Sequence, residues 1–260
     1  MEKIESPEEI KNRAKEMKRM AERRKKQGVQ TKSFGNHQPF YHYRLHVPRL
    51  QKSCTGALKP FGAYLGSIFD AYPPLLFDSP TSLRCSTVSF DFPFTITRGT
   101  SEHLSTLTRD ALEQSPYKAG HDKVQLHFLD NDESILTTET PVWATDRECD
   151  LLEIINAKTT IRQNHPAFTA LTGHIDLVQI KDGNVWILDY KPITSWSQSE
   201  YPECQTYLYA LLLSIRSGLP LDTFRCGWFN DKDFNYFIPR TLDPDLIERF
   251  YTLKNFHGQE

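Results

Sequence analysis

The chain has 260 residues, and 31 Lys and Arg against 33 Asp and Glu give it a formal net charge of −2. Hydrophobic residues make up 38% and charged residues 25%, as in a soluble globular protein of one large domain with additions or two small ones. This composition excludes a membrane-spanning protein, because the longest nearly apolar run covers only residues 207–215 and a span needs about 20 apolar residues.

An intracellular location is expected from the N-terminus and from the cysteines. The first ten residues, MEKIESPEEI, are polar and acidic, unlike a secretion signal or an Arg-rich transit peptide. The five cysteines form no CxxC pair, which argues against a disulfide scaffold, a zinc ribbon and a compact cysteine-ligated cluster. They are Cys54, Cys85, Cys149, Cys204 and Cys226.

Positive charge is concentrated near the N-terminus, within residues 1–27. Residues 11–26 carry nine Lys and Arg and two Glu, a local charge of +7 that leaves −9 for the rest of the chain. Ser6 and Pro7 predict the start of a helix, since Ser is a favoured N-cap and Pro is favoured in the first turn. The helix has little to bury, so it is either a solvated terminal helix or a basic arm that binds phosphates. Such an arm would use Lys18, Arg19, Arg23, Arg24, Lys25 and Lys26.

Residues 28–83 are rich in Pro, Gly, His and aromatic residues and show no sustained hydrophobic period. We expect them to form an irregular extension packed on the main domain. His37, His42 and His46 lie in this region without acidic or cysteine partners nearby in the sequence. That setting favours surface or core histidines over a metal site.

From residue 84 onward, helical and strand patterns alternate. Strands are expected over 123–130, 135–143, 223–229 and 234–239, with a hairpin over 173–191. Helices are expected over about 100–114 and 199–217, with a helical or mixed stretch over 147–163 and a last short helix from near Pro244. This order predicts an α/β core over residues 84–260, with a central mixed sheet flanked by helices.

The hairpin over 173–191 is predicted to bring two carboxylates face to face. Asp182-Gly183 is a strong two-residue turn signal between apolar strands, and it sets a register in which paired residue numbers sum to 365. In that register Asp176 lies opposite Asp189, and strand alternation places Lys191 on the same face as Asp189.

Two facing carboxylates repel each other unless a cation lies between them. A hard divalent cation such as Mg²⁺ satisfies both, because it prefers a few carboxylates together with water and phosphate oxygens. The alternative is a structural bridge between Lys191 and one aspartate on an exposed face, which leaves the second aspartate unexplained.

Asp189 follows Asp176 by thirteen positions and begins the tripeptide Asp189-Tyr190-Lys191. This arrangement resembles the core of the PD-(D/E)XK nucleases, and the fuller pattern is similar to their RecB-like branch. That branch also has Gly-x-x-x-His, Gly-x-x-Asp and Gln-x-x-x-Tyr elements, which match residues 99–103, 173–176 and 205–209. The four elements occur in the family's order over roughly residues 84–240.

The resemblance implies a restriction-endonuclease-like fold and hydrolysis of phosphodiester bonds with Mg²⁺ or Mn²⁺. It implies that the metal is held by His103, Asp176, Asp189 and the carbonyl of Tyr190. It implies catalytic roles for Asp176, Asp189, Lys191, Gln205 and Tyr209. Lys191 would position or activate the attacking water, while Gln205 and Tyr209, one helical turn apart, would orient Lys191 and contact the DNA strand.

Two features of the RecB-like branch are not expected here. Several members contain an iron–sulfur cluster that needs three clustered cysteines late in the chain, whereas Cys204 and Cys226 belong to no cluster, so we expect no iron–sulfur centre. The sequence also has no Gly-rich P-loop, so a helicase motor would have to come from a partner in trans.

The expected function is that of a metal-dependent deoxyribonuclease. Relatives of the RecB type process DNA ends or single strands, so an exonuclease or a flap-processing enzyme of DNA repair, recombination or defence is favoured over a sequence-specific cutter. Two alternatives stay open: a non-catalytic nucleic-acid-binding or assembly subunit on the same fold, and a nuclease that acts on RNA.

Overall fold

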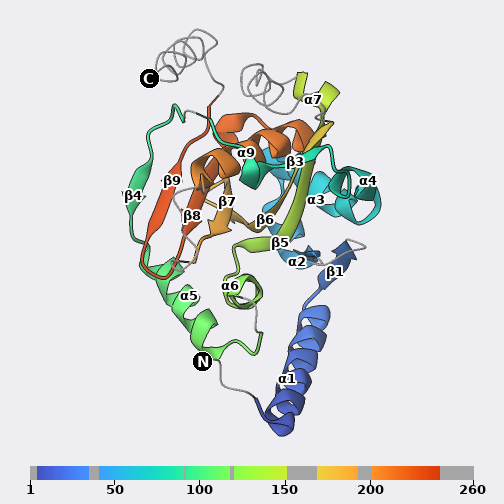
Figure 1. Cartoon of the computed structure of the whole chain (residues 1–260), viewed down its shortest axis with the longest axis vertical. Helices are drawn as coiled ribbons and strands as arrows, with labels where there is room; N and C mark the ends of the chain where they lie inside the picture. The colour runs from blue at the N-terminus through green and yellow to red at the C-terminus, as the bar shows by residue number, and fades with distance from the viewer. Residues whose placement is uncertain are drawn as a thin grey trace.

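A nine-stranded mixed sheet forms the centre of the molecule and is flanked by helices (Figure 1). The computed structural model describes residues 5–34, 41–90, 92–117, 120–150, 169–192 and 201–240, without the side chains of 149 and 150. The predicted α/β class with a central mixed sheet is confirmed. No helix in these ranges is long and apolar enough to span a membrane.

The strand order in the sheet is β1-β2-β5-β6-β7-β8-β9-β4, and β3 pairs with β6 off this path. The pairs β7–β8 and β3–β6 are parallel, and the other pairs are antiparallel. The strands are β1 (Val29–Phe34), β2 (Tyr41–His46), β3 (Ser82–Arg84), β4 (Thr97–Gly99), β5 (Ile135–Thr145), β6 (Ala170–Lys181), β7 (Asn184–Tyr190), β8 (Phe224–Phe229) and β9 (Phe234–Phe237).

Helices bury two apolar clusters against this sheet. The larger cluster contains side chains of α3 and α9, and the smaller one contains side chains of α5 and α6. The helices are α1 (Pro7–Lys26), α2 (Val47–Ser53), α3 (Lys59–Ala71), α4 (Pro74–Phe77), α5 (Glu102–Gln114), α6 (Gly120–Asn131), α7 (Asp146–Asp150) and α9 (Pro202–Ser217).

Helix α9 carries the chain from β7 to its parallel neighbour β8, a connection that needs a crossover. It ends at Gly218, whose φ of 69° gives the left-handed cap that glycine favours. The helix predicted over 199–217 and the strands predicted near 223–229 and 234–239 are therefore confirmed. The helix predicted over 100–114 and the strand over 135–143 are confirmed as α5 and β5.

The predicted hairpin register is also confirmed. β6 pairs with β7 from Lys181↔Asn184 to Leu177↔Leu188, and each pair sums to 365. The turn residues Asp182 and Gly183 both have positive φ, 51° and 72°, as the hairpin turns that suit the twist of a sheet require.

The strand predicted over residues 123–130 is wrong, because this segment forms helix α6. Val124, Leu126 and Phe128 alternate in the sequence, which imitates the two-residue period of a strand. The helix is buried over a wide arc that also includes Gln125 and Leu129, so it lacks the narrow apolar stripe of a surface helix.

The expectation of an irregular segment over residues 28–83 is also wrong. This segment contains β1, β2, β3, α2, α3 and α4, and its strands extend the central sheet. β1 is buried only at its two ends, so it carries no alternating pattern from which a strand could be recognised. Beyond Asp150, the stretch predicted as helical to residue 163 lies outside the described residues, as do His37 and the segment from Pro244.

Helix α1 begins with the predicted cap, since Ser6 and Glu9 form a reciprocal capping box. It extends away from the body of the molecule (Figure 1). Its attachment is Arg24, which donates two hydrogen bonds to the Asp130 carboxylate at 2.7 and 2.6 Å and one to the Tyr117 hydroxyl at 2.9 Å. Arg24 is buried, so it anchors the helix and is not part of an exposed basic surface.

Replacing Arg24 with Ala should loosen the whole of α1. The change leaves Asp130 mostly buried without its partner, and the loss of one partner of such a pair costs about 3 kcal/mol. We expect faster amide hydrogen exchange throughout residues 7–26. Arg23→Ala removes the exposed neighbour and is the matched control, with unchanged exchange. Equal exchange in both variants would show that the Arg24–Asp130 pair does not hold the helix.

Candidate active site

Three acidic side chains lie in one row across β5, β6 and β7. The β5–β6 pairs on either side of Glu139 place it opposite Asp176. The β6–β7 ladder ends one position before Asp176 and Asp189, which the register places opposite each other. There the backbone N–H of Tyr190 donates to the Asp176 carboxylate at 2.8 Å. The β6–β7 ladder of hydrogen bonds therefore ends where the three carboxylates lie.

Glu139 has a backbone conformation that is unusual for a residue other than glycine. Its φ is 52°, in the left-handed region, which marks a constrained position and often a functional one. The Gln125 amide donates both to Glu139 and, at 2.9 Å, to Asp176, so it bridges the two carboxylates. The other Glu139 oxygen, Oε2, is buried and has no hydrogen-bond partner among the described residues.

Two cationic side chains lie against the row of carboxylates. His121 Nδ1 is 3.3 Å from Asp176 Oδ2, and Lys191 Nζ is 2.9 Å from Asp189 Oδ2. Lys191 also donates to Gln205 Oε1 at 3.0 Å. The two outer carboxylates, Glu139 and Asp189, thus each lie near a glutamine amide. The two cations compensate part of the negative charge of the row.

Gln205 and Tyr209 lie one turn apart on α9 and both reach the pocket. The Gln205 amide donates to Asp189 Oδ1 at 3.1 Å and to the Tyr209 hydroxyl at 2.8 Å. Its carbonyl oxygen accepts from Lys191, so one side chain fixes both the lysine and the aspartate of the Asp-x-Lys element.

The carboxylates titrate away from their ordinary range. Burial and then the charge of Asp176 raise the pKa of Glu139 to about 7, and burial raises the pKa of Asp189 to about 6 against the effect of Lys191. Burial alone would raise the pKa of Asp176, but His121 and the Tyr190 N–H lower it. The charge of Asp176 raises the pKa of His121 to about 9. Without a further cation, the site contains more carboxyl groups than it readily keeps ionised.

The residues enclose a pocket of about 350 Å³. No group of three or more His, Cys, Asp or Glu side chains within the described ranges is already arranged to hold a metal ion. The donor chemistry nevertheless fits a hard divalent cation, since Glu139, Asp176 and Asp189 supply oxygens and Glu139 Oε2 has no partner.

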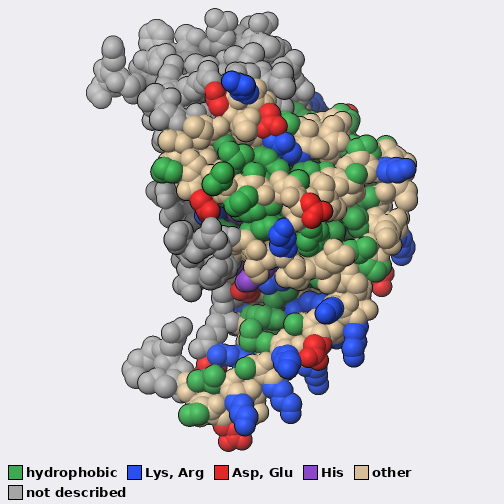
Figure 2. Space-filling view, turned by 90° about the vertical axis from the view of Figure 1, so that its right-hand side faces the viewer, with side chains coloured by type: hydrophobic (Ala, Val, Ile, Leu, Met, Phe, Trp, Pro, Cys, Tyr) green, Lys and Arg blue, Asp and Glu red, His purple; other side chains and the backbone are tan. Residues whose placement is uncertain are grey.

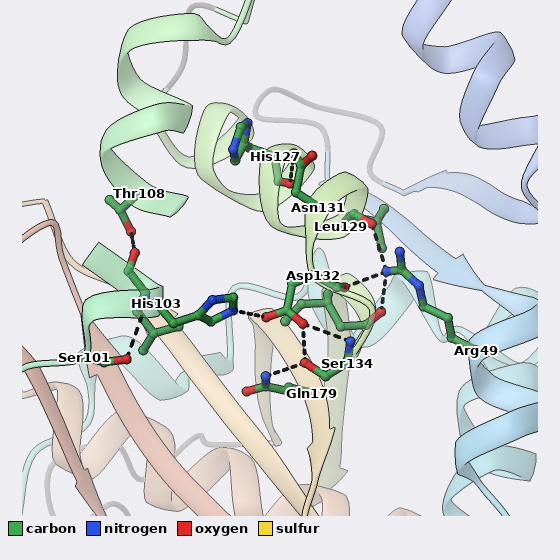
Figure 3. Close-up of polar contacts among 12 residues, drawn as sticks. Arg49, Ser101, His103, Thr108, His127, Leu129, Asn131, Asp132, Ser134 and Gln179 are labelled. Carbon is green, nitrogen blue, oxygen red and sulfur yellow. Dashed lines mark hydrogen bonds and ion pairs between the residues drawn. The ribbon is translucent and has the colours of Figure 1, made fainter. Parts of the chain in front are cut away.

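His103 is placed elsewhere in the structure (Figure 3). Its Nε2 lies 2.9 Å from Asp132 Oδ2, and its side chain is 59% exposed. Asp132 also accepts from the backbone and hydroxyl of Ser134, and these hydrogen bonds with that of His103 lower its pKa against the effect of burial. Neither His103 nor Asp132 lines the pocket. The structure therefore does not bring His103 to the carboxylates, and His121 occupies that position.

The other predicted residues are brought together. Asp176, Asp189, Lys191, Gln205 and Tyr209 all line the pocket, whereas Tyr190 does not line it and contacts the site only by donating its backbone N–H to Asp176. His121, Gln125 and Glu139 were not predicted. Glu139 could have been predicted, because it is the one acidic residue of β5. His121 and Gln125 can be predicted only if residues 120–131 are recognised as a helix.

Gly173 is required by the packing of Tyr209. A Cβ built at Gly173 would lie 2.3 Å from Cε1 of the Tyr209 ring, much closer than two carbon atoms approach. The Gly-x-x-Asp and Gln-x-x-x-Tyr elements are therefore in direct contact, and the missing side chain lets α9 approach β6.

Replacing Gly173 with Ala should displace Tyr209 and, with it, Gln205. We expect a loss of stability of about 1–3 kcal/mol from overpacking, measured by urea unfolding, and a larger fall in any catalytic activity. Gly99→Ala is the control, because nothing lies within 4 Å of a Cβ at this strand glycine. A Gly173→Ala variant as stable and as well ordered as Gly99→Ala would contradict the proposed contact.

Comparison with known proteins supplies one match. The family model of the PD-(D/E)XK nuclease superfamily matches residues 95–249, more than half of the chain. No curated protein and no solved structure matches significantly. The matched range contains the three carboxylates, Lys191 and the strands that hold them, and the mixed sheet flanked by helices agrees with a restriction-endonuclease-like fold. The chain belongs to the PD-(D/E)XK nuclease superfamily.

Proposed function

We propose that this protein is a metal-dependent deoxyribonuclease that hydrolyses phosphodiester bonds. The observation that carries the proposal is the row of Glu139, Asp176 and Asp189 with Lys191 in contact with it. Buried carboxylates of this density require a cation, and a lysine beside them suits a reaction in which a phosphate gains negative charge.

We assign the metal to Glu139, Asp176 and Asp189, with His121 as the adjacent imidazole in the place first predicted for His103. Mg²⁺ or Mn²⁺ bound there would lower the pKa of a water molecule and neutralise phosphate oxygens. The carbonyl of Tyr190 remains a proposed further ligand.

The chain's own residues position the reacting groups. Lys191 is held by both Asp189 and Gln205, so its ammonium is fixed at the pocket rather than free to rotate. A fixed ammonium stabilises charge that develops on a phosphate oxygen, and removing such a group typically costs 10²–10³-fold in rate. Gln205 acts through this lysine and is therefore a positioning residue. Tyr209 accepts a hydrogen bond from Gln205 and helps to hold it.

The finer assignment to the RecB-like branch is also a proposal. Three of that branch's four elements supply residues of the pocket, namely those of the Gly-x-x-Asp, Asp-x-Lys and Gln-x-x-x-Tyr patterns. On this resemblance we favour an exonuclease or end-processing enzyme that acts on single strands or DNA ends, with any helicase supplied by a partner.

A groove beside α1 supports a nucleic-acid path to the pocket. It has a volume of about 910 Å³, and its mostly uncharged lining includes the cations Lys25, Arg44 and the anchor Arg24. Arg44 lies 3.9 Å from Asp122, which lines the active-site pocket, so the groove opens beside that pocket. Figure 2 shows Lys and Arg side chains along the exposed surface of α1. The exposed residues of the predicted basic arm are Lys18, Arg19, Arg23, Lys25 and Lys26.

The function is tested with Lys191→Ala. End-labelled single- and double-stranded DNA and RNA are incubated with the protein and Mg²⁺ or Mn²⁺, with a chelator control. We expect DNA cleavage that stops with the chelator and falls at least about 100-fold in Lys191→Ala. Lys181→Ala is the matched control, an exposed lysine of the same hairpin. Cleavage that survives both the chelator and Lys191→Ala would refute the mechanism, and binding without cleavage would show a non-catalytic subunit.

The basic arm is tested by replacing its five exposed cations with Gln while Arg24 is kept. Each phosphate contact contributes about 0.7 to the salt dependence of single-strand binding, so the slope should fall by up to about 3 to 4. Fluorescence anisotropy over a salt series measures this. The control replaces five exposed cations elsewhere, Lys52, Lys59, Arg109, Lys181 and Lys232. If both variants lose affinity equally, total charge rather than α1 determines binding.

A further inference from the structure

A stack of rings lines one wall of the active-site pocket and has no part in the mechanism described above. The imidazole of His174 lies parallel to the Tyr41 ring, with centroids 3.8 Å apart and planes 3° from parallel. Phe77 contacts His174 with centroids 5.0 Å apart. The guanidinium of Arg84 lies over Tyr41, 5.3 Å from its centroid. Tyr41, Arg84 and His174 all line the pocket.

His174 is an unusual residue for such a packed position. It is only 8% exposed, and neither ring nitrogen has a hydrogen-bond partner among the described residues. A neutral imidazole carries one donor and one acceptor nitrogen, and leaving them unpaired in the interior is unfavourable. A phenylalanine would fill the same space between Tyr41 and Phe77 without that penalty, so packing does not explain the histidine.

The position of His174 relative to Asp176 indicates what its partner is. The two residues are two positions apart on β6, so their Cα atoms lie about 6.6 Å apart on one side of the strand. That separation is of the order of one nucleotide step along a strand. A nucleic acid strand that runs along β6 from a phosphodiester bond at Asp176 would therefore place a neighbouring nucleotide at His174.

Arg84 completes this wall with a positive charge. It is exposed and makes no ion pair within the described part of the chain. Its guanidinium lies over the face of Tyr41 at the pocket, and a guanidinium binds phosphate through two parallel hydrogen bonds.

We propose that Arg84, Tyr41 and His174 form a subsite for the nucleotide that adjoins the cleaved phosphodiester bond. Arg84 pairs with the phosphate of that nucleotide and His174 hydrogen-bonds its nucleoside. Tyr41, which covers the imidazole and is half-buried, is the ring that shifts to admit it. The subsite rests on the proposed function, because it presumes that a nucleic acid strand enters this pocket.

Two variants test the subsite without disturbing the stack. His174→Phe keeps a ring between Tyr41 and Phe77 but removes both nitrogens, and Arg84→Gln removes an exposed charge. Binding of a fluorescent 12-nucleotide DNA strand is measured in a chelator, where no cleavage occurs. We expect each variant to bind about tenfold more weakly than wild type. Arg98→Gln, an exposed arginine outside the pocket, should bind as wild type does.

Hydrolysis separates this subsite from the reacting centre. With Mn²⁺, both variants should raise KM for the oligonucleotide but leave turnover of bis(p-nitrophenyl) phosphate, which has no nucleoside, within twofold of wild type. If both variants bind the oligonucleotide as wild type does, the subsite is refuted while the nuclease assignment stays intact. The same holds if the variants lose hydrolysis of the oligonucleotide and of bis(p-nitrophenyl) phosphate equally. A wild-type protein that cleaves neither substrate would refute the proposed function, and the binding measurement would still decide whether His174 and Arg84 contact the strand.

Discussion

The mutual repulsion of three carboxylates governs the centre of this structure. Glu139, Asp176 and Asp189 occupy one row of three adjacent strands, where their charges would oppose folding if nothing compensated them. The surrounding groups are those that make such a row tolerable: amide donors from two glutamines, a backbone N–H, and the cations His121 and Lys191. Burial raises the pKa of both Glu139 and Asp189, and the charge of Asp176 adds to this effect.

Helix α6 contacts this row on one side and the basic helix α1 on the other. α6 directs His121 and Gln125 toward the carboxylates, while Val124 and Phe128 pack in the apolar core. Its last turn carries Asp130, which holds the basic helix α1. Helix α6 therefore contacts both the carboxylates of the pocket and the basic helix α1.

Sequence patterns predicted the parts of the site that depend on local geometry. The turn at Asp182-Gly183 and strand alternation were enough to place Asp176 near Asp189, and a four-residue spacing placed Gln205 and Tyr209 on one face of α9. The pattern of helix α6 predicts a strand, because a helix buried on several sides has no apolar stripe and its alternating apolar residues imitate a strand. The assignment of His103 followed from a short motif, whereas the structure pairs that histidine with Asp132.

The sequence by itself determined the superfamily, the hairpin and the central Asp-x-Lys element, because these depend on residues close together in the chain whose relative positions follow from strand and helix periods. Only the tertiary structure decided which histidine reaches Asp176, that Glu139 joins the carboxylate row, and that Arg24 is an anchor rather than a free cation. Each of these depends on a contact between segments distant in the chain, where packing and burial select one partner among several of the same chemical type.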